Sequence, residues 1–394
     1  MGSASSASRM RILLFLHSFG PGGVERVALR LAGAWAEAGH DVRLLMGRNE
    51  GPESCLAPTN IVYDYAPRRP LARHFETLWM VRQLISAVRR HQPDVLFCAG
   101  NTYTIVAALV RLLLGPECPP IVSKLSNSLE RRDLPAPLRS CYRIWLRQHP
   151  RFIDHFIGLS EPMRSEIQDL LQADPDRVTI IPNPVLTSKD LQMLADRPIS
   201  ANCGRRFVAV GRLTRQKNFP LLLKAFARIA KKDDRLVIVG EGPQRRRLAR
   251  KAGRLGIAGL VDLPGHKQSI ARLLHGADVF VSSSNYEGMP GAVVESLAAG
   301  MPIVATNSSV CLEHLLRHGE LGQLVPIRDV VGLANALQHA PRREALPRQA
   351  MRLAAARYTI EQSAHLYLNA LAAVTCTPFS EMDPEPIGPI AEAA

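Results

Sequence analysis

The sequence predicts an α/β protein with two domains, each a parallel β-sheet covered by helices on both faces. Three observations support this fold class. Short apolar segments of strand length alternate with longer segments of helical periodicity in both halves. The alternation stops at the irregular run 181–185. A polar, linker-like segment follows up to Arg205, and the alternation then begins again. The chain has 394 residues, enough for two domains of ordinary size.

The first half is predicted to begin with a strand, a glycine-rich turn and an amphipathic helix. The strand is expected at Ile12–Leu16 and the helix from Val24 to Ala38. Gly39 should end this helix before a second strand at Asp41–Leu45. Further strands of this half are expected at Val95–Cys98, Ile121–Lys124, Phe156–Leu159 and Val178–Ile181.

The second half repeats the pattern after the linker. Its strands are expected at Phe207–Val210, Arg235–Val239, Val261–Leu263, Val279–Ser282 and Ile303–Ala305, with a helix at Leu221–Ile229. We therefore predict a first domain over residues 10–198 and a second over 199–357. An amphipathic helix follows at Thr359–Val374, with Thr359 as its N-cap. The ends, 1–9 and 376–394, are poor in apolar residues and are expected to be disordered.

The net charge of +14 is concentrated in one segment. Residues 205–272 contain 18 Lys and Arg against 4 Asp and Glu, a difference that equals the whole excess. This balance favours an anionic partner: nucleic acid, an anionic membrane surface or a phosphorylated substrate. Nucleic acid is not expected, because the aromatic residues of the segment, Phe207, Phe219 and Phe226, occupy core-like positions. The seven scattered cysteines are typical of free thiols in a reducing compartment.

Two glycine-containing turns follow predicted strands, one in each half. Gly20-Pro21-Gly22-Gly23 precedes the first helix, where glycines and free N–H groups suit a phosphate or a sugar. These residues could equally form an ordinary tight turn. In the second half, Gly211 begins a loop that offers Arg212 and Lys217 to a diphosphate, whose negative charge grows as it leaves. A solvated basic loop is the alternative.

A third turn lies between two acids, Glu287 and Glu295. It follows the strand Val279–Ser282 and contains Gly288-Met289-Pro290. Gly288 is expected to permit an unusual backbone, and Pro290 suits the first turn of the next helix. Both acids would then suit hydrogen bonds to sugar and ribose hydroxyls. Because two acids at this spacing are common by chance, the interpretation depends on the strand-turn-helix setting.

Several runs fit one family pattern together. They are Gly211-Arg212…Lys217, Glu287 and Glu295 with seven residues between them, and the runs at 21–26, 181–185, 240–243 and 296–306. With these motifs the sequence resembles family-4 glycosyltransferases of the GT-B fold, of the type that builds bacterial polysaccharides and glycolipids. The resemblance covers roughly residues 10 to 375.

The resemblance implies two Rossmann-like domains that face each other across a cleft, with the last helix (358–375) crossing back to the first. It also implies retention of sugar stereochemistry, with no metal and no other cofactor. The catalytic residues it implies are Glu287, Arg212 and Lys217, the two cations binding the donor diphosphate and Glu287 the donor sugar. The donor-binding residues it implies are Gly22, Gly23, Arg212, Lys217, His266, Glu287, Gly288, Met289, Pro290 and Glu295, with Glu295 on the ribose and His266 near the base.

The sequence departs from the family pattern in two places. Many relatives carry a histidine after a mid-sheet strand of the first domain, where this sequence reads Ile-Val-Ser-Lys-Leu-Ser-Asn-Ser over 121–128. The acceptor-side candidates are therefore His17, Asn101, Lys124 and Asn127. The run 306–311 also lacks a glycine that is often found there, which affects the finer donor contacts.

A basic amphipathic segment at 131–151 is a candidate contact with an anionic membrane. Arg139, Arg143 and Arg147 recur every four residues, and the interleaved Tyr142 and Trp145 suit a headgroup boundary. The alternative is an ordinary helix that packs on its own sheet, because arginine stems also cover protein surfaces.

The sequence thus predicts a retaining glycosyltransferase that moves a sugar from a UDP- or GDP-sugar to a carbohydrate acceptor, expected to be lipid-linked. We expect it in the cytoplasm, on the cytoplasmic face of the inner membrane. Three alternatives stay open: a sugar-nucleotide epimerase or phosphorylase on a similar fold, a non-catalytic homologue that binds nucleotide or glycan, and a nucleic-acid-binding module.

Overall fold

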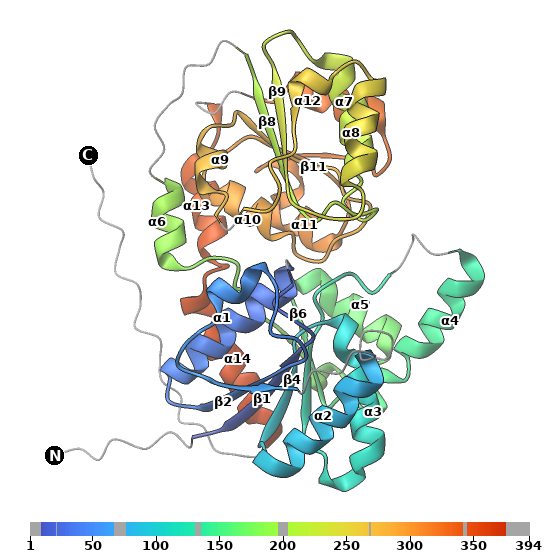
Figure 1. The fold of residues 1–394 in the computed structure, drawn as a ribbon, viewed down its shortest axis with the longest axis vertical. Coiled ribbons are helices and arrows are strands. Elements are labelled where there is room, and N and C mark those ends of the chain that lie inside the picture. The colour runs from blue at the N-terminus through green and yellow to red at the C-terminus, as the bar shows by residue number, and fades with distance from the viewer. Residues whose placement is uncertain are drawn as a thin grey trace, which may run out of the picture.

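The two halves of the chain each form a parallel β-sheet covered by helices, and in Figure 1 the second half lies above the first. The computed structural model describes residues 9–20, 22–66, 76–130, 135–195, 204–267, 269–341 and 345–375. The predicted strands are confirmed, with ends shifted by one residue at most. The α/β class with two parallel sheets is therefore correct.

In the described residues, the first sheet has seven strands in the order β3-β2-β1-β4-β5-β6-β7. They are β1 (Arg11–Leu16), β2 (Asp41–Met46), β3 (Val62–Tyr65), β4 (Val95–Cys98), β5 (Ile121–Lys124), β6 (His155–Gly158) and β7 (Val178–Ile180). The helices of this half are α1 (Gly23–Glu37), α2 (Glu76–His91), α3 (Thr104–Leu114), α4 (Ala136–Leu146) and α5 (Glu161–Leu171). Every pairing is parallel, so the carboxyl ends of the strands meet at one edge.

The second sheet, within the same described ranges, has six strands in the order β10-β9-β8-β11-β12-β13. They are β8 (Arg206–Val210), β9 (Arg235–Val239), β10 (Val261–Asp262), β11 (Val279–Ser282), β12 (Ile303–Thr306) and β13 (Gln323–Val325). Its helices are α7 (Phe219–Ile229), α8 (Arg245–Arg254), α9 (Ala271–His275), α10 (Gly291–Ala298), α11 (Val310–Leu315) and α12 (Val330–Gln338). Two more helices, α13 (Arg348–Ala356) and α14 (Ile360–Thr375), end the described chain.

The polar segment before Arg205 is not simply a linker. It contains α6 (Ser188–Ala195), which packs against α10 and α13. This helix has a narrow apolar face, in which Leu194 is buried and Leu191 partly buried, so the sequence pattern is weak there. The domain boundary predicted at 198/199 lies within 196–203, outside the described residues, as do the ends 1–8 and 376–394.

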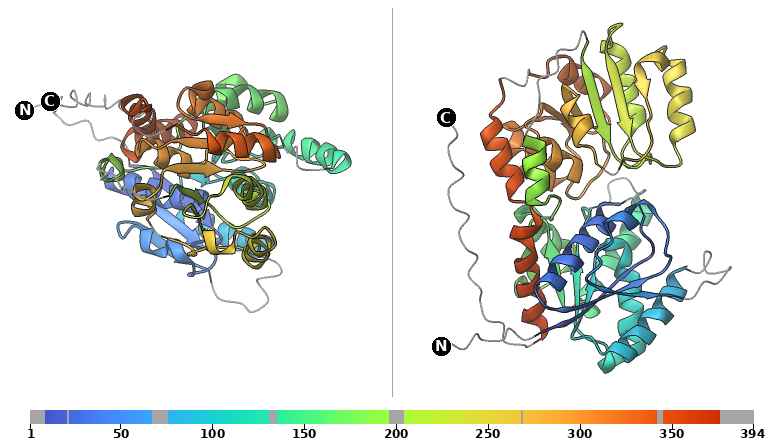
Figure 2. Two further views of the ribbon diagram at one scale, coloured as in Figure 1. Left: turned by 90° about the horizontal axis from the view of Figure 1, so that it is seen from above. Right: turned by 60° about the vertical axis from the view of Figure 1, so that its left-hand side comes forward.

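The last helix crosses back to the first sheet, as the resemblance implied (Figures 1 and 2). Helix α14 packs against α1 and β4. The Trp35 indole N–H donates to the Ala364 carbonyl oxygen at 3.2 Å, and the rings of Phe97 and Tyr367 lie edge to face. Tyr367 is fully buried in this contact. The end of the chain is therefore part of the core around the first sheet.

Candidate active site

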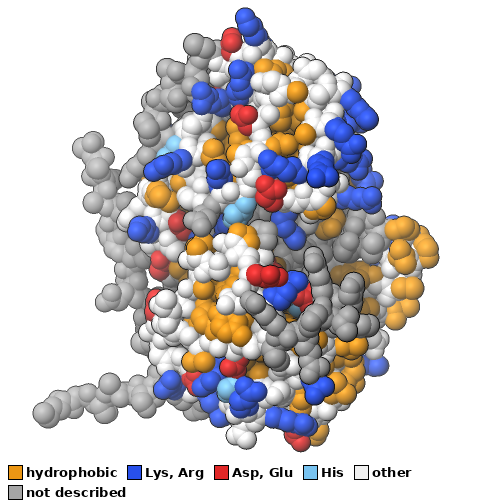
Figure 3. Space-filling model, viewed as in Figure 1, with side chains coloured by type: hydrophobic (Ala, Val, Ile, Leu, Met, Phe, Trp, Pro, Cys, Tyr) orange, Lys and Arg blue, Asp and Glu red, His pale blue; other side chains and the backbone are white. Residues whose placement is uncertain are grey.

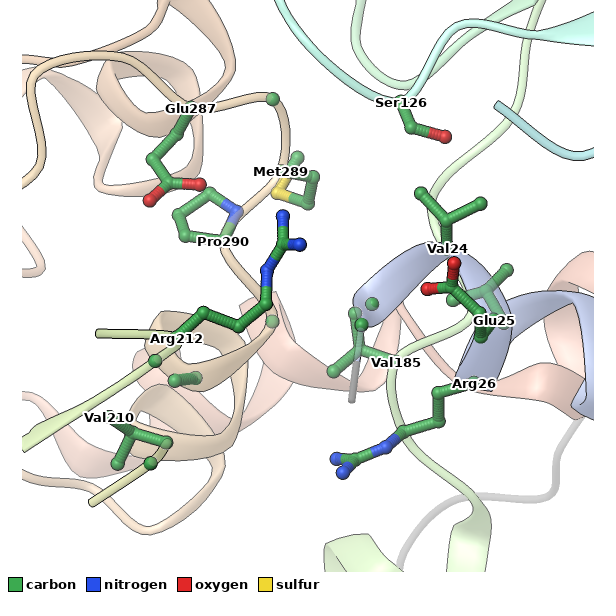
Figure 4. A pocket seen from close by; sticks show the side chains of 18 of the residues that line it. Val24, Glu25, Arg26, Ser126, Val185, Val210, Arg212, Glu287, Met289 and Pro290 are labelled. Carbon is green, nitrogen blue, oxygen red and sulfur yellow. The ribbon is translucent and has the colours of Figure 1, made fainter. Parts of the chain in front are cut away.

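A cavity of about 320 Å³ lies between the carboxyl ends of the two sheets (Figure 4). It is lined by the start of α1, the loops after β4, β5, β8 and β9, and the turn before α10. Thirteen of the predicted site residues line it: Gly22, Gly23, Asn101, Lys124, Asn127, Arg212, Lys217, His266, Glu287, Gly288, Met289, Pro290 and Glu295. Segments more than 250 residues apart in the sequence, from Gly22 to Glu295, therefore form one site.

His17 does not line this cavity. Its ring stacks on Tyr103 with 5.0 Å between centroids, and its Nδ1 lies 3.8 Å from a Glu76 carboxylate oxygen. Burial lowers the pKa of His17 below its usual value. A contact of this histidine with an acceptor finds no support in this geometry.

The loop after β8 brings two cations to the cavity. Gly211 has a φ of 155°, and a Cβ there would lie 2.6 Å from Lys217 Cε, so glycine lets the lysine stem pass close to the backbone. Lys217 Nζ forms an ion pair with Glu287 at 2.6 Å. The exposed Arg212 side chain points into the cavity from the same loop (Figure 4). Arg212 is thus available to an anion, whereas Lys217 is shared with Glu287.

Glu287 is held by several polar groups of its own half. Its side chain is nearly buried and, besides Lys217, accepts hydrogen bonds from Ser284 Oγ at 2.6 Å and Gln216 Nε2 at 3.4 Å. The prediction that Pro290 suits the start of the helix agrees with its position as the N-cap residue of α10. These contacts fix the carboxylate at the cavity wall.

The turn at Gly288 touches the first half of the chain directly. Asn127 and Gly288 form an antiparallel bridge, and the Ser128 N–H donates to the Glu287 carbonyl oxygen at 3.4 Å. A Cβ on Gly288 would lie 1.8 Å from the Ser126 carbonyl oxygen. Gly288 is not among the glycines with positive φ, so the expected unusual backbone is wrong. Glycine is required here because another backbone approaches so closely.

Asn101 organises the loop that makes this contact. Its Oδ1 accepts hydrogen bonds from the backbone N–H groups of Ser126 at 2.6 Å and Asn127 at 3.2 Å, and its Nδ2 donates to the Asn127 carbonyl oxygen. Glu166 on α5 holds the same loop and was not predicted from the sequence. One carboxylate oxygen of Glu166 accepts from Ser128 Oγ and from the next two backbone N–H groups at 2.6–2.8 Å.

Lys124 is a buried cation at the first-half wall of the cavity, and the charge of Glu25 on α1 favours its protonated form. Lys124 is 1% exposed, its Nζ donates to Ser126 Oγ at 3.2 Å, and burial lowers its pKa to about 7. Burial also raises the pKa of Glu25, which accepts a hydrogen bond from the Tyr103 hydroxyl at 3.2 Å. Glu25 was not predicted as a site residue, although it lies in the run 21–26 that fits the family pattern.

Glu295 faces a cation from the opposite half. Arg26 Nη1 lies 4.0 Å from the Glu295 carboxylate, and the same guanidinium forms hydrogen bonds of 3.1 and 3.3 Å with Glu53. Burial raises the pKa of Glu295 to about 7, although Arg26 and Arg30 oppose this shift. Arg26 and Glu53 also line the cavity. They were not predicted from the sequence, because they come close to Glu295 only through contacts between residues that are far apart in the chain.

His266 and the next residue, Lys267, close the end of the cavity beyond β9 and β10. Gly265, which precedes them, has a φ of 83°. Its carbonyl oxygen accepts a hydrogen bond of 2.9 Å from the backbone N–H of Gly240. Within the described ranges, no three His, Cys, Asp or Glu side chains gather in a way that would hold a metal ion. The same part of the chain contains no helix long and apolar enough to cross a bilayer.

Two family models match the chain, one in each half. The model described as "Glycosyltransferase Family 4" matches residues 21–189, and the one described as "Glycosyl transferases group 1" matches residues 204–341. Together they include all the cavity-lining residues and every strand of both sheets except β1. The chain belongs to the family-4 glycosyltransferases, and its fold is GT-B.

Similar proteins include enzymes of bacterial surface polysaccharides. The chain is 34% identical, over 33% of its length and 38% of the relative, to the lipopolysaccharide core biosynthesis glycosyltransferase LpsE of Rhizobium meliloti. It is 28% identical, over 42% of its length and 45% of the relative, to an N-acetylgalactosaminyltransferase of Campylobacter jejuni whose name gives a diphospho-undecaprenol-linked acceptor. The chain spans less than two thirds of the first curated relatives it matches, 64% of one and 20% of another.

Solved structures support the same fold. Anabaena Alr3699/HepE in complex with UDP-glucose superposes with a TM-score of 0.72 at 18% identity, covering 93% of this chain and all of that one. At this identity the likeness concerns the fold alone.

Proposed function

We propose that the protein is a retaining glycosyltransferase of polysaccharide or glycolipid assembly. It moves a sugar from a UDP- or GDP-sugar to a lipid-linked carbohydrate acceptor. One observation carries the proposal. A single cavity between two sheet edges combines the cations Arg212 and Lys217, the acids Glu287 and Glu295, and the N-terminus of α1. Such a set matches a diphosphate flanked by a hydroxyl-rich sugar and a ribose.

The donor diphosphate would lie between the loop after β8 and the start of α1. Arg212 offers a planar fork of donors, and the first N–H groups of α1, which begins at Gly23, have no partner in a preceding turn of the helix. Glu287 would bind sugar hydroxyls while Lys217 balances its charge. Glu295 would bind the ribose, and His266 would lie beside the base.

The reaction we propose retains the configuration at the anomeric carbon. The bond from that carbon to the diphosphate oxygen breaks, the acceptor oxygen attaches on the same face, and its proton passes to the departing phosphate oxygen. Arg212 and Lys217 would stabilise the charge that grows on the diphosphate, which is the task that a divalent cation performs in other enzymes. We accordingly propose that no metal and no other cofactor takes part.

The acceptor would enter from the first half of the chain, beside Lys124, Asn127 and the newly found Glu25. The names of LpsE and of the Campylobacter enzyme support an acceptor that is a lipid-anchored saccharide. A lipid-linked acceptor places the enzyme at a bilayer, and we propose the cytoplasmic face of the inner membrane. The candidate contact is the part of 131–151 that the structure describes, in which α4 exposes Leu138 and Ile144.

Binding of the donor should be visible without any acceptor. A thermal-shift screen with UDP-, GDP-, ADP- and CMP-sugars is expected to show selective stabilisation by a UDP- or GDP-sugar, about 3 kcal/mol at a hundredfold excess over Kd. The free sugars are the matched controls and should not shift the midpoint. Failure of every nucleotide-sugar to stabilise the protein would overturn the donor assignment, and binding without transfer to any saccharide would favour a non-catalytic homologue.

Donor affinity is expected to depend on pH through Glu295. Ionised Glu295 can accept hydrogen bonds from both ribose hydroxyls, and its pKa is raised to about 7. Affinity measured by calorimetry should therefore rise about tenfold from pH ~6 to pH ~8, as the proton leaves. Glu295→Gln should abolish this rise. A fall in affinity with rising pH would instead point to Lys124, which loses its positive charge near pH 7.

A further inference from the structure

The basic segment of the second half contains one charged helix face that the proposed site does not use. Five residues of α8 make up this face, which we name the cationic ridge: Arg246, Arg247, Arg250, Lys251 and Arg254. At about 100° per residue they occupy an arc of about 140° on the helix. The opposite face carries the buried Leu248 and Ala252, which anchor α8 to its sheet. The ridge therefore faces away from the protein core.

The ridge is unfavourable for the folded protein by itself. Arg246 and Arg247 lie in the first turn of α8, where the helix dipole disfavours cations. Pairs such as Arg246 and Arg250 place like charges four residues apart, which also destabilises a helix. In the described part of the chain, none of the five ridge side chains forms an ion pair with a carboxylate. An anionic partner would remove these costs.

The neighbouring helix adds to the same positive surface. Lys224 and Arg228 of α7 are exposed, and α7 packs against α8. Burial lowers the pKa of Lys251, and the nearby charges of Lys224, Arg247 and Arg254 lower it further. The cations thus lie close enough to repel one another, as expected for a surface that binds a dense array of negative charge.

Apolar side chains are exposed on the same side of the first half. Figure 3 shows blue side chains along the right-hand edge of the second half and orange ones at the right-hand edge of the first half below it, and Figure 1 shows α8 and α4 on that side of their halves. Helices α3 and α4 carry exposed apolar side chains: Ile105, Leu112, Leu113, Leu138 and Ile144. Trp145, in contrast, is half-buried against His149 and is not the anchor that the sequence suggested.

We propose that the cationic ridge binds anionic phospholipid headgroups, so that both halves of the protein contact the bilayer. Helix α8 would supply electrostatic attraction, and α3 and α4 the apolar contact. Each basic residue near an anionic bilayer raises the affinity of a protein for that bilayer about fivefold. Nucleic acid fits less well, because the ridge offers no aromatic side chain for base stacking. The inference rests on the proposed membrane-linked acceptor for its role in the cell, but its test needs no sugar transfer.

The test compares two charge-reversing double variants in sedimentation with phosphatidylcholine vesicles, with and without phosphatidylglycerol. The ridge variant carries Arg246→Glu with Arg247→Glu. The control variant carries Lys231→Glu with Lys232→Glu, which reverses two exposed cations of the α7–β9 loop and changes the net charge by the same amount. The ridge variant should bind phosphatidylglycerol vesicles at least about tenfold more weakly than the unchanged protein, and the control variant less than about threefold. High salt should remove the difference.

The ridge substitutions should not unfold the protein, because they place acids in the first turn of α8 and opposite Arg250 and Lys251. Stabilisation by the nucleotide-sugar, measured on both variants, separates this test from the proposed function. A companion variant, Leu138→Asp with Ile144→Asp, should weaken binding even at high salt. Equal losses in the ridge and control variants, unchanged vesicle binding, or tighter binding to DNA than to phosphatidylglycerol vesicles at physiological ionic strength would each overturn the proposal.

Discussion

Replacing Arg212 with alanine is expected to lower kcat of sugar transfer by about 100- to 1,000-fold. The exposed Arg212 side chain lines the cavity at the point where charge would grow on the leaving diphosphate. Its guanidinium forms no ion pair within the described residues, although its charge acts to lower the pKa of Glu25, so its removal should also make Glu25 easier to protonate. Initial rates at saturating donor and acceptor would measure the effect.

Arg215→Ala is the matched control, because Arg215 is exposed on the same loop but does not line the cavity. Its backbone carbonyl, which accepts a hydrogen bond from Asn285 Nδ2, is unaffected by the substitution. We expect wild-type kcat for this variant and an unchanged unfolding midpoint for both. Equal losses in the two variants would show that general positive charge, and not the position of Arg212, matters for turnover.

Gly288→Ala is expected to lower kcat/KM by about a hundredfold or more, because the two halves of the protein could no longer meet at this turn. The added Cβ would lie 1.8 Å from the Ser126 carbonyl oxygen and 2.8 Å from Asn127 Cα. Both are backbone atoms held by Asn101, so they cannot move aside at low cost. Steady-state kinetics together with small-angle scattering would show the lost activity and a more open molecule.

Gly253→Ala provides the comparison for this substitution. A Cβ at Gly253 meets nothing within 4 Å, and alanine favours a helix, so activity should be unchanged and stability equal or slightly higher. Normal activity of Gly288→Ala would mean that the Asn127–Gly288 bridge is dispensable for transfer. Unfolding of Gly288→Ala at ambient temperature would mean that the contact also stabilises the fold.

Most strands and the strand-end motifs could be predicted because their signals are local, whereas β3 and β13 were not predicted. An apolar run such as Val279–Ser282 followed by Gly288-Met289-Pro290 specifies a buried parallel strand, a turn and a helix within a few residues. The carboxyl ends of parallel strands gather at one edge, so residues at those ends could be expected to share a site. Glu287 and Arg212 line the same cavity for this reason.

The partners of these residues could not be predicted, because they come from distant parts of the chain. Glu295 faces Arg26 across the two halves, and the loop at Asn127 is held by Glu166 from another helix. Nothing in the local sequence specifies such pairs. For His17 the position after a strand was correct, but its ring stacks on Tyr103 and does not line the cavity. Helix α6 was missed since its apolar face is only a few residues wide.

The packing of α14 beneath α1 has a consequence for protein engineering. Because Trp35 and Tyr367 share one core, the second sheet is in effect an insertion within the chain that builds the first. A chimera meant to exchange donor preference between relatives should therefore replace an internal cassette, from near residue 204 to the end of α13, and keep the recipient's own final helix. A chimera that joins the N-terminal half of one protein to the C-terminal half of another would instead pack a foreign α14 against the first sheet. The residue of that helix at the position of Tyr367 would then meet a core that evolved with a different partner.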